Sequence, residues 1–198
     1  DAVEVYDGTD VLDPSDFLVD SDGDGLSDNY EAMILTDPNA IDSDQDGETD
    51  AQEYFGLRNR IRSNPLDADT DDDGILDGEE RGSLVDGRYV GGSSPIDFDT
   101  DKDGLSDGQE IGLIAPQVSE FLIATDIGIF KPDQDPTSQT SNTIADTDGD
   151  GLKDGYEDRN QNGKVEAQET DPEQFDTDRD GMDDGWENSV ADCDEDLN

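Results

Sequence analysis

The chain has 198 residues, of which 57 are Asp or Glu and only 11 are Lys or Arg, so its formal net charge is −46. Leu, Ile, Val and Phe together make up 39 residues, a composition at the border of intrinsic disorder. The charge disfavours binding to nucleic acid or anionic lipid, and no apolar run is long enough to span a membrane. With no His and one Cys, the chain lacks the usual catalytic sets, so we expect no enzyme.

The acidic residues follow a twelve-residue pattern, Asp-x-Asp-x-Asp-Gly-x-x-Asp-x-x-Glu, whose positions we number 1 to 12. We number the loops in chain order: loop 1 (20–31), loop 2 (42–53), loop 3 (69–80), loop 4 (99–110), loop 5 (146–157), loop 6 (158–169) and loop 7 (176–187). Six loops are complete, whereas loop 6, DRNQNGKVEAQE, has Asn at positions 3 and 5. All seven keep Gly at position 6 and Glu at position 12, which an acidic composition alone does not explain.

This spacing suits calcium. Ca²⁺ takes about six to eight oxygens, and such a loop supplies them from positions 1, 3 and 5, a backbone carbonyl at 7, position 9 directly or through water, and a bidentate Glu at 12. Gly at position 6 allows the sharp turn. Mg²⁺ prefers a smaller octahedral shell, and Zn²⁺ lacks its His and Cys ligands. The predicted metal ligands are Asp20, Asp22, Asp24, Leu26, Asp28, Glu31, Asp42, Asp44, Asp46, Glu48, Asp50, Glu53, Asp69, Asp71, Asp73, Ile75, Asp77, Glu80, Asp99, Asp101, Asp103, Leu105, Asp107, Glu110, Asp146, Asp148, Asp150, Leu152, Asp154, Glu157, Asp158, Asn160, Asn162, Lys164, Glu166, Glu169, Asp176, Asp178, Asp180, Met182, Asp184 and Glu187.

In chain order, the sequence begins with an extended segment, 1–19, in which AVEVYDGTDVL alternates apolar and polar residues like a strand. Loops 1 to 4 form a first calcium-binding array over 20–110. It contains an insertion at about 83–92, SLVDGRYVGG, whose Asp-Gly between short apolar runs predicts a β-hairpin. An apolar insertion and linker occupies 111–145, loops 5 to 7 form a second array over 146–187, and the tail 188–198 resembles a truncated motif.

Proline separates the repeats. Pro38, Pro65, Pro95 and Pro172 each stand four residues before position 1 of the next loop. Because proline stops a helix and favours extended geometry before it, each unit should run from loop to short helix to extended approach. Position 7 is apolar in five loops, so each repeat should bury a small apolar core. The predicted fold class is irregular: mostly loop with short helices and a few short strands, stapled by calcium.

Three segments are candidate contacts for a protein partner or for self-assembly. The apolar segment 111–130 is either a packing element that covers adjacent repeats or a docking surface. Arg58, Arg60 and Arg62 either pair with nearby carboxylates or contact the acidic surface of another copy, which would favour a filament. The N-terminal strand either pairs within its own chain or adds to a neighbour's sheet.

The string DxDxDGLxDxxE, repeated after a (T/S)(D/N)P step, resembles the thrombospondin type 3 calcium-binding repeats in the form common on bacterial and archaeal surface proteins. The resemblance covers 20–187 apart from the insertions. The chain lacks the disulfides of the animal form, because Cys193 is its only cysteine, and loop 6, with Val165 at position 8, is closer to EF-hand and dockerin loops. The resemblance implies an extracellular stalk, adhesive module or matrix component.

The sequence therefore predicts an extracellular or cell-surface calcium-binding structural protein: a stalk, an adhesin segment, or a subunit of a surface filament or matrix. It would hold about seven Ca²⁺, or more if linking acids such as Asp67 and Asp97 also coordinate. Two alternatives stay open, a dockerin-like partner-binding module around loop 6 and a spacer region of a secreted hydrolase. Extracellular modules bind calcium at roughly 10⁻⁴ to 10⁻³ M, which cytosolic calcium cannot fill.

Overall fold

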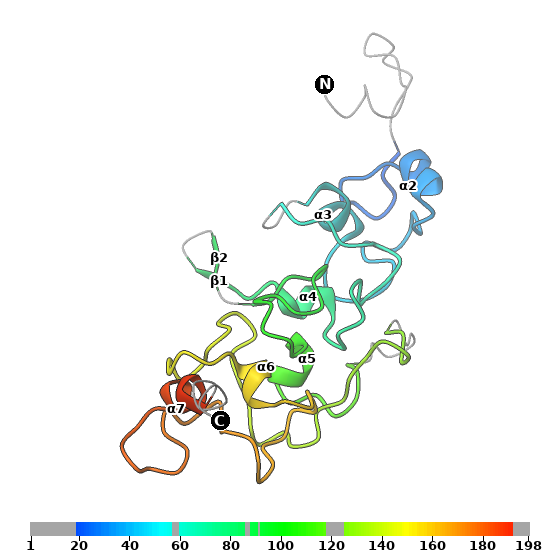
Figure 1. Cartoon of the computed structure of the whole chain (residues 1–198). Helices are drawn as coiled ribbons and strands as arrows, with labels where there is room; N and C mark the ends of the chain where they lie inside the picture. Colours follow the sequence, from blue (N-terminus) through cyan, green and yellow to red (C-terminus); the bar gives the residue numbers. More distant parts are fainter. Residues whose placement is uncertain (1–18, 57–59, 86–87, 91, 118–124, 192–198) are drawn as a thin grey trace.

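The computed structural model describes residues 19–56, 60–85, 88–90, 92–117 and 125–191. These residues are mostly loop with six short helices and one two-stranded hairpin (Figure 1). The helices are α2 (Asp28–Ile34), α3 (Asp50–Phe55), α4 (Asp77–Glu80), α5 (Asp107–Glu110), α6 (Asp154–Glu157) and α7 (Asp184–Ala191). The hairpin pairs β1 (Ser83–Val85) with β2 (Arg88–Val90) in antiparallel register. Among the described residues, no helix has the length and apolar character needed to cross a membrane.

Several predictions of the sequence fall on residues that the structure does not describe. They are the strand within 1–18, Arg58, the middle of the apolar insertion at 118–124, and most of the tail, 192–198. These stay predictions.

Each loop is wound around its own first carboxylate. At position 1, Asp42 accepts from the N–H of Gln45 (2.6 Å) and of Gly47 (3.0 Å), positions 4 and 6 of the loop. The turn needs glycine at position 6, because Gly104, for example, has a φ of 116° that L side chains rarely adopt. Position 4 is also left-handed, as at Lys102 with a φ of 63°. The loop geometry therefore comes from the chain's own hydrogen bonds.

Position 9 begins each helix and closes the loop. The N–H of Asp107 donates to the carbonyl of Phe98 (3.1 Å), and its carboxylate accepts from the N–H (2.9 Å) and hydroxyl (2.7 Å) of Thr100 at position 2. The Thr100 hydroxyl accepts in turn from the N–H of Ser94 (2.9 Å). The carboxylate bonds between positions 9 and 2 recur in all six complete loops.

The complete loops stack on one another, so the helices follow in chain order from α2 to α7 along an elongated body (Figure 1). The N–H at position 10 donates to the position 5 carboxylate of the preceding loop in the stack, in the pairs Ala51–Asp24 (2.9 Å), Gly155–Asp103 (3.2 Å) and Gly185–Asp150 (2.7 Å). Four loops have Gly at position 10, where an added Cβ would overlap the carbonyl oxygen at position 5 of the neighbour. Consecutive loops therefore touch through their backbones.

Loop 6 lies outside this stack, because the last of these contacts joins loop 7 directly to loop 5. Loop 6 instead contacts loop 4 and the linker: the carbonyl of Gln161 accepts from the Gln109 side chain (3.0 Å), and the carbonyl of Asn162 accepts from the N–H of Gln134 (2.9 Å). It has Arg159 in place of the position 2 hydroxyl and no helix in its second half. Loops 4 and 5 are also in contact, so the complete loops form one continuous stack.

The apolar core is small, and the buried apolar side chains of the described residues all lie in the first array. Met182, at position 7 of loop 7, is 38% exposed, so the expectation of an apolar core in each repeat is wrong for that loop. Leu26, Tyr30 and Ala51 form a buried cluster between loops 1 and 2, and Ile75 and Leu105 are each 3% exposed at position 7 of their loops. Since these residues alone bury little apolar surface, the loops depend on other interactions to hold them together.

Loop 2 has a buried ion pair where five of the other loops have an apolar residue. Glu48 at position 7 is fully buried, and its carboxylate lies 2.6 Å from Nε of Arg81, the residue that follows loop 3. Arg81 also donates to the hydroxyl of Ser63 (2.6 Å). Moving loop 3 away from loop 2 would separate this pair and leave a buried charge without its partner. The pair of Arg81 and Glu48 therefore fixes loop 3 on loop 2.

The apolar insertion folds back over loop 3. The N–H of Gln117 donates to the carbonyl of Gly74 (2.8 Å), and the hydroxyl of Thr125 donates to the carboxylate of Asp69 at position 1. The ring of Phe130 lies against Gly74, where it leaves no room for a Cβ. The described part of the insertion thus packs on a neighbouring repeat, the first of the two interpretations of 111–130.

Candidate metal centres

The structure brings together the carboxylates at positions 1, 3 and 5 that the spacing predicts as ligands. In loops 1, 2 and 3, these three carboxylates have oxygens within 4.8 Å of one another. The position 5 carboxylate is oriented by the loop itself, since Asp73 accepts from the N–H of Ile75 at position 7 (2.7 Å). This bond leaves the second oxygen of Asp73 without a hydrogen-bond partner.

A second kind of cluster joins consecutive loops. Positions 5 and 12 of one loop lie within 4.8 Å of position 9 of the next, as Asp46, Glu53 and Asp77 between loops 2 and 3, and Asp73, Glu80 and Asp107 between loops 3 and 4. All six side chains are buried. The spacing assigns position 9 to its own loop, whereas the structure also places it beside the closing Glu of the preceding loop. A cation held at positions 5 and 12 would therefore fix the next loop as well.

The residues present fit a calcium ion. Both carboxylate oxygens of Glu31, Glu80 and Glu157 are buried without a hydrogen-bond donor among the described residues. Glu53 and Glu110 each accept one hydroxyl, from Ser63 (3.0 Å) and Thr140 (3.1 Å), and keep one oxygen unpartnered. An isolated buried carboxylate is strongly unfavourable, and an all-oxygen set of carboxylates with a closing Glu is what Ca²⁺ prefers.

Burial has a large effect on these acids in the metal-free chain. Burial, reinforced by the charges of Asp44 and Asp46, raises the pKa of Glu53 to about 10. Burial and the neighbouring Asp73 raise the pKa of Glu80 to about 11, and burial beside Asp103 raises the pKa of Glu110 to about 10. At neutral pH the folded, metal-free chain would have to keep such groups protonated.

We therefore expect acid to favour folding of the metal-free chain. The pKa values of Glu53, Glu80 and Glu110 lie above the ordinary value of 4.5, so the folded state binds more protons than the unfolded state. Stability should fall as pH rises from about 4.5 towards about 10. In chelator, far-UV circular dichroism and the hydrodynamic radius should show a more compact chain at pH 5 than at pH 8. Equal expansion at both pH values would contradict this expectation.

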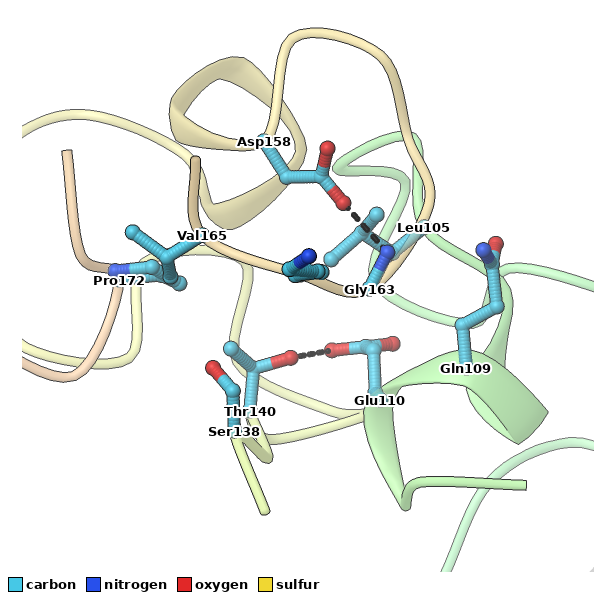
Figure 2. Close-up of a pocket in the computed structure, with 10 residues that line it drawn as sticks. Leu105, Gln109, Glu110, Ser138, Thr140, Asp158, Gly163, Val165 and Pro172 are labelled. Atoms are coloured by element: carbon cyan, nitrogen blue, oxygen red, sulfur yellow. Dashed lines mark hydrogen bonds between the residues drawn. The ribbon is translucent and has the colours of Figure 1, made fainter. Parts of the chain in front are cut away.

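Loop 6 is built differently from the others. The side-chain amides at positions 3 and 5, Asn160 and Asn162, donate to the carboxylate of Glu166 at position 9 (2.8 and 3.1 Å). Two of the usual loop bonds remain: Asp158 at position 1 accepts from the N–H of Gly163 (2.6 Å; Figure 2), and Asn162 at position 5 accepts from the N–H of Lys164 (2.9 Å). The predicted ligands of loop 6 are thus brought together around amide groups.

A cavity of about 20 Å³ lies where loop 4, the linker and loop 6 meet. Figure 2 shows Glu110 with its bond from Thr140 and, from loop 6, Asp158 and Val165 among the lining residues. A space of this size holds a water molecule or an ion and not an organic substrate.

Two sets of residues that shape these centres are not among the residues predicted from the sequence. The first is the Ser or Thr at position 2 of the six complete loops, and the second is the Gly at position 10 of loops 3, 4, 5 and 7. Both are visible when the loops are aligned with one another. They were not recognised because neither type is a metal ligand in the spacing rule.

We expect Thr100→Val to destabilise the calcium-loaded chain by about 1–3 kcal/mol, because it removes the hydroxyl bond to Asp107 and leaves the N–H of Ser94 without its acceptor. Thr143→Val is the matched control, because Thr143 is exposed and its hydroxyl, among the described residues, pairs only with that of Ser141. Urea unfolding in saturating calcium measures both variants. Equal stabilities would show that the position 2 hydroxyl contributes nothing.

A family model described as the bacterial TSP3 repeat matches the chain at residues 20–40, 99–111 and 146–160, that is at loops 1, 4 and 5. The resemblance drawn from the repeated acidic string is confirmed at these three places, and the repeat is a non-catalytic one. Neither the search of curated proteins nor the search of solved structures gives a match.

Proposed function

Because the chain carries calcium-binding repeats of the bacterial TSP3 type, we propose that it is an extracellular structural protein whose stack of loops is held rigid by about seven Ca²⁺ ions. The observation that carries the proposal is the series of buried carboxylate oxygens without hydrogen-bond partners among the described residues, repeated at positions 3 and 12 of loops 1 to 5. The proposed ligands are the positions predicted from the sequence, with position 9 also serving the preceding loop.

The proposed role is that of a stalk, an adhesin segment, or a subunit of a surface filament or matrix. A stack in which each loop contacts mainly its neighbours gives an extended body, as in other repeat arrays. Self-assembly through arginines has limited support, since the guanidinium of Arg62 lies over the Tyr54 ring of its own chain (5.8 Å from the centroid). We favour the stalk.

The proposed location outside the cell rests on the calcium affinity expected of these loops, which is too low for cytosolic calcium to fill them. Loops of this chemistry in extracellular modules fill at roughly 10⁻⁴ to 10⁻³ M calcium. The high acidity also leaves the loaded chain strongly anionic, because seven Ca²⁺ ions, each of charge +2, would change the formal charge from −46 to −32. Such a chain stays soluble and avoids anionic surfaces.

Small-angle scattering and electron microscopy, in calcium and then in chelator, test the proposal. We expect an extended, well-defined particle in calcium and an expanded coil in chelator, with Mg²⁺ at equal ionic strength failing to restore the particle. Isolated rods would support a stalk, whereas ordered fibres would support a filament subunit. A particle with the same shape in calcium and in chelator would contradict the proposal.

One observation weighs against the dockerin-like alternative. Loop 6, the loop closest to that type, contacts loop 4 and the linker through Gln109 and Gln134. These contacts favour a structural role for loop 6 over a partner-binding one. Nothing in the described residues supports the hydrolase-spacer alternative over the stalk.

A further inference from the structure

Loop 6 is contacted by a carboxylate from outside its own sequence. Asp133, in the linker before loop 5, is 3% exposed, and its N–H donates to the carbonyl of Leu113 (2.8 Å). The next residue, Gln134, donates its N–H to the carbonyl of Asn162 in loop 6 (2.9 Å). These bonds hold the Asp133 side chain against the turn of loop 6, where a Cβ on Gly163 would overlap its carboxylate.

Asp133 and Asp158 each use one carboxylate oxygen in a hydrogen bond and leave the other one without a partner among the described residues. Asp133 accepts at Oδ1 from the N–H of Asp135 (2.8 Å), and Asp158 accepts at Oδ2 from the N–H of Gly163 (2.6 Å). The other oxygen of each, Oδ2 of Asp133 and Oδ1 of Asp158, is buried without a hydrogen-bond partner among the described residues. Both side chains are 3% exposed. Two buried carboxylates at the same glycine, each with an unused acceptor, offer oxygens that a cation would neutralise.

The other two acids of loop 6 differ from Asp133 and Asp158, because they accept hydrogen bonds from within the loop. Glu166 and Glu169 both accept from the side-chain amide of Asn160 (2.8 and 3.1 Å), and Glu169 also accepts from the N–H of Glu166 (3.0 Å). In the stacked loops, the closing Glu is instead buried beside position 9 of the following loop. Loop 6 has no following loop on it, since loop 7 stacks on loop 5. The carboxylate that lies against loop 6 comes instead from the linker, where Asp133 packs against Gly163.

We propose that Asp133 and Asp158 together coordinate a calcium ion, which forms a centre between the linker and loop 6. The inference rests on the proposed calcium-binding function, and it adds a ligand that lies outside every twelve-residue loop. Carboxylates supplemented by carbonyl and water oxygens are an ordinary ligand set for Ca²⁺. The ion would fasten loop 6 to the linker at the point where it leaves the stack.

Ion counting tests the inference on the full chain. Native mass spectrometry and calorimetric titration with calcium would compare the wild type with Asp133→Asn and Asp135→Asn. The second variant is the matched control, because it makes the same charge change in the same segment but its carboxylate bonds to Thr137. We expect Asp133→Asn to bind one ion fewer and Asp135→Asn to keep the wild-type count. The same count and affinities in Asp133→Asn as in the wild type would overturn the inference.

A second measurement does not depend on the folding of the Asp133 variant. If both carboxylates hold one ion, Asp158→Asn should abolish the calcium-dependent hydrogen-exchange protection of residues 131–137. Protection that survives in Asp158→Asn would overturn the shared centre. A wild-type chain that binds no calcium would refute the proposed function itself, whereas normal binding with unchanged variants would refute only this centre.

Discussion

Removal of calcium is expected to turn the ordered stack into a largely unfolded chain at neutral pH. The apolar cores are too small to hold the loops, and the carboxylates at positions 5, 9 and 12 would be buried together without a counter-charge. Burial and the charges of Asp71 and Asp46 would oppose ionisation of Asp77 in particular, raising its pKa to about 8. Unfolding would release this repulsion.

The size of the effect follows from linkage. At calcium about twentyfold above the dissociation constant, each site contributes roughly 1.8 kcal/mol, and seven sites contribute on the order of 10 kcal/mol. That is comparable to the whole net stability of an ordinary domain, about 5–15 kcal/mol. Chelation should therefore abolish folding rather than weaken it.

Circular dichroism and small-angle scattering at pH 7.5 would measure the transition, and calcium added in excess should reverse it. Magnesium at the same concentration is the control, because it prefers a smaller octahedral shell. A chain that stays compact in chelator would show that the loops do not depend on the ions.

The local geometry of each loop was predictable, because it is encoded within twelve residues. In the six complete loops, the Gly at position 6, the carboxylates at 1, 3 and 5, and the helix that begins at position 9 all follow from spacing and backbone conformation, whereas the short helix expected in every unit is absent from loop 6. The helix of loop 4 begins at Asp107 as the pattern requires, and Ser106 before it caps the first turn. The hairpin signal at Asp-Gly also coincides with a pair of strands.

The arrangement of the loops was not predictable, because it depends on contacts between distant residues. The N–H of Gly185 reaches Asp150 across the whole of loop 6, and nothing in the spacing indicates that loop 7 stacks on loop 5. Asp133 likewise belongs to no twelve-residue pattern, since it lies in a Pro- and Gln-containing linker with only Asp135 near it in the sequence. The pairing of Glu48 with Arg81 could not be read from the pattern, which treats position 7 as a backbone ligand.

Glu80→Gln is expected to have opposite effects in calcium and in chelator. Glu80 closes loop 3 at the middle of the stack, and both of its oxygens are buried without a donor beside Asp73 and Asp107. In calcium, the substitution removes a charged bidentate ligand and loosens the junction of loops 3 and 4. We expect at least one ion to be lost and the free energy of unfolding to fall by roughly 2 kcal/mol or more.

In chelator, Glu80→Gln should stabilise the folded chain instead of destabilising it. Burial and Asp73 raise the pKa of Glu80 to about 11, so the folded metal-free chain keeps it protonated while the unfolded chain ionises it at pH 7.5. Gln has the shape of the protonated acid and carries no such cost, so Glu80→Gln should leave the metal-free chain more compact than the wild type. Calcium titration and urea unfolding in calcium measure the effect of Glu80→Gln on the loaded chain. The hydrodynamic radius in chelator measures its effect on the metal-free chain.

Glu187→Gln is the matched control for this reversal. Glu187 holds the same position 12 in loop 7, but it is only partly buried and no later described loop stacks on it. Its replacement should remove a single ion and change the metal-free chain much less than Glu80→Gln. Destabilisation by Glu80→Gln in both conditions would mean that Glu80 is needed for packing itself. The crossover would instead show that its buried charge is tolerated only because a cation sits against it.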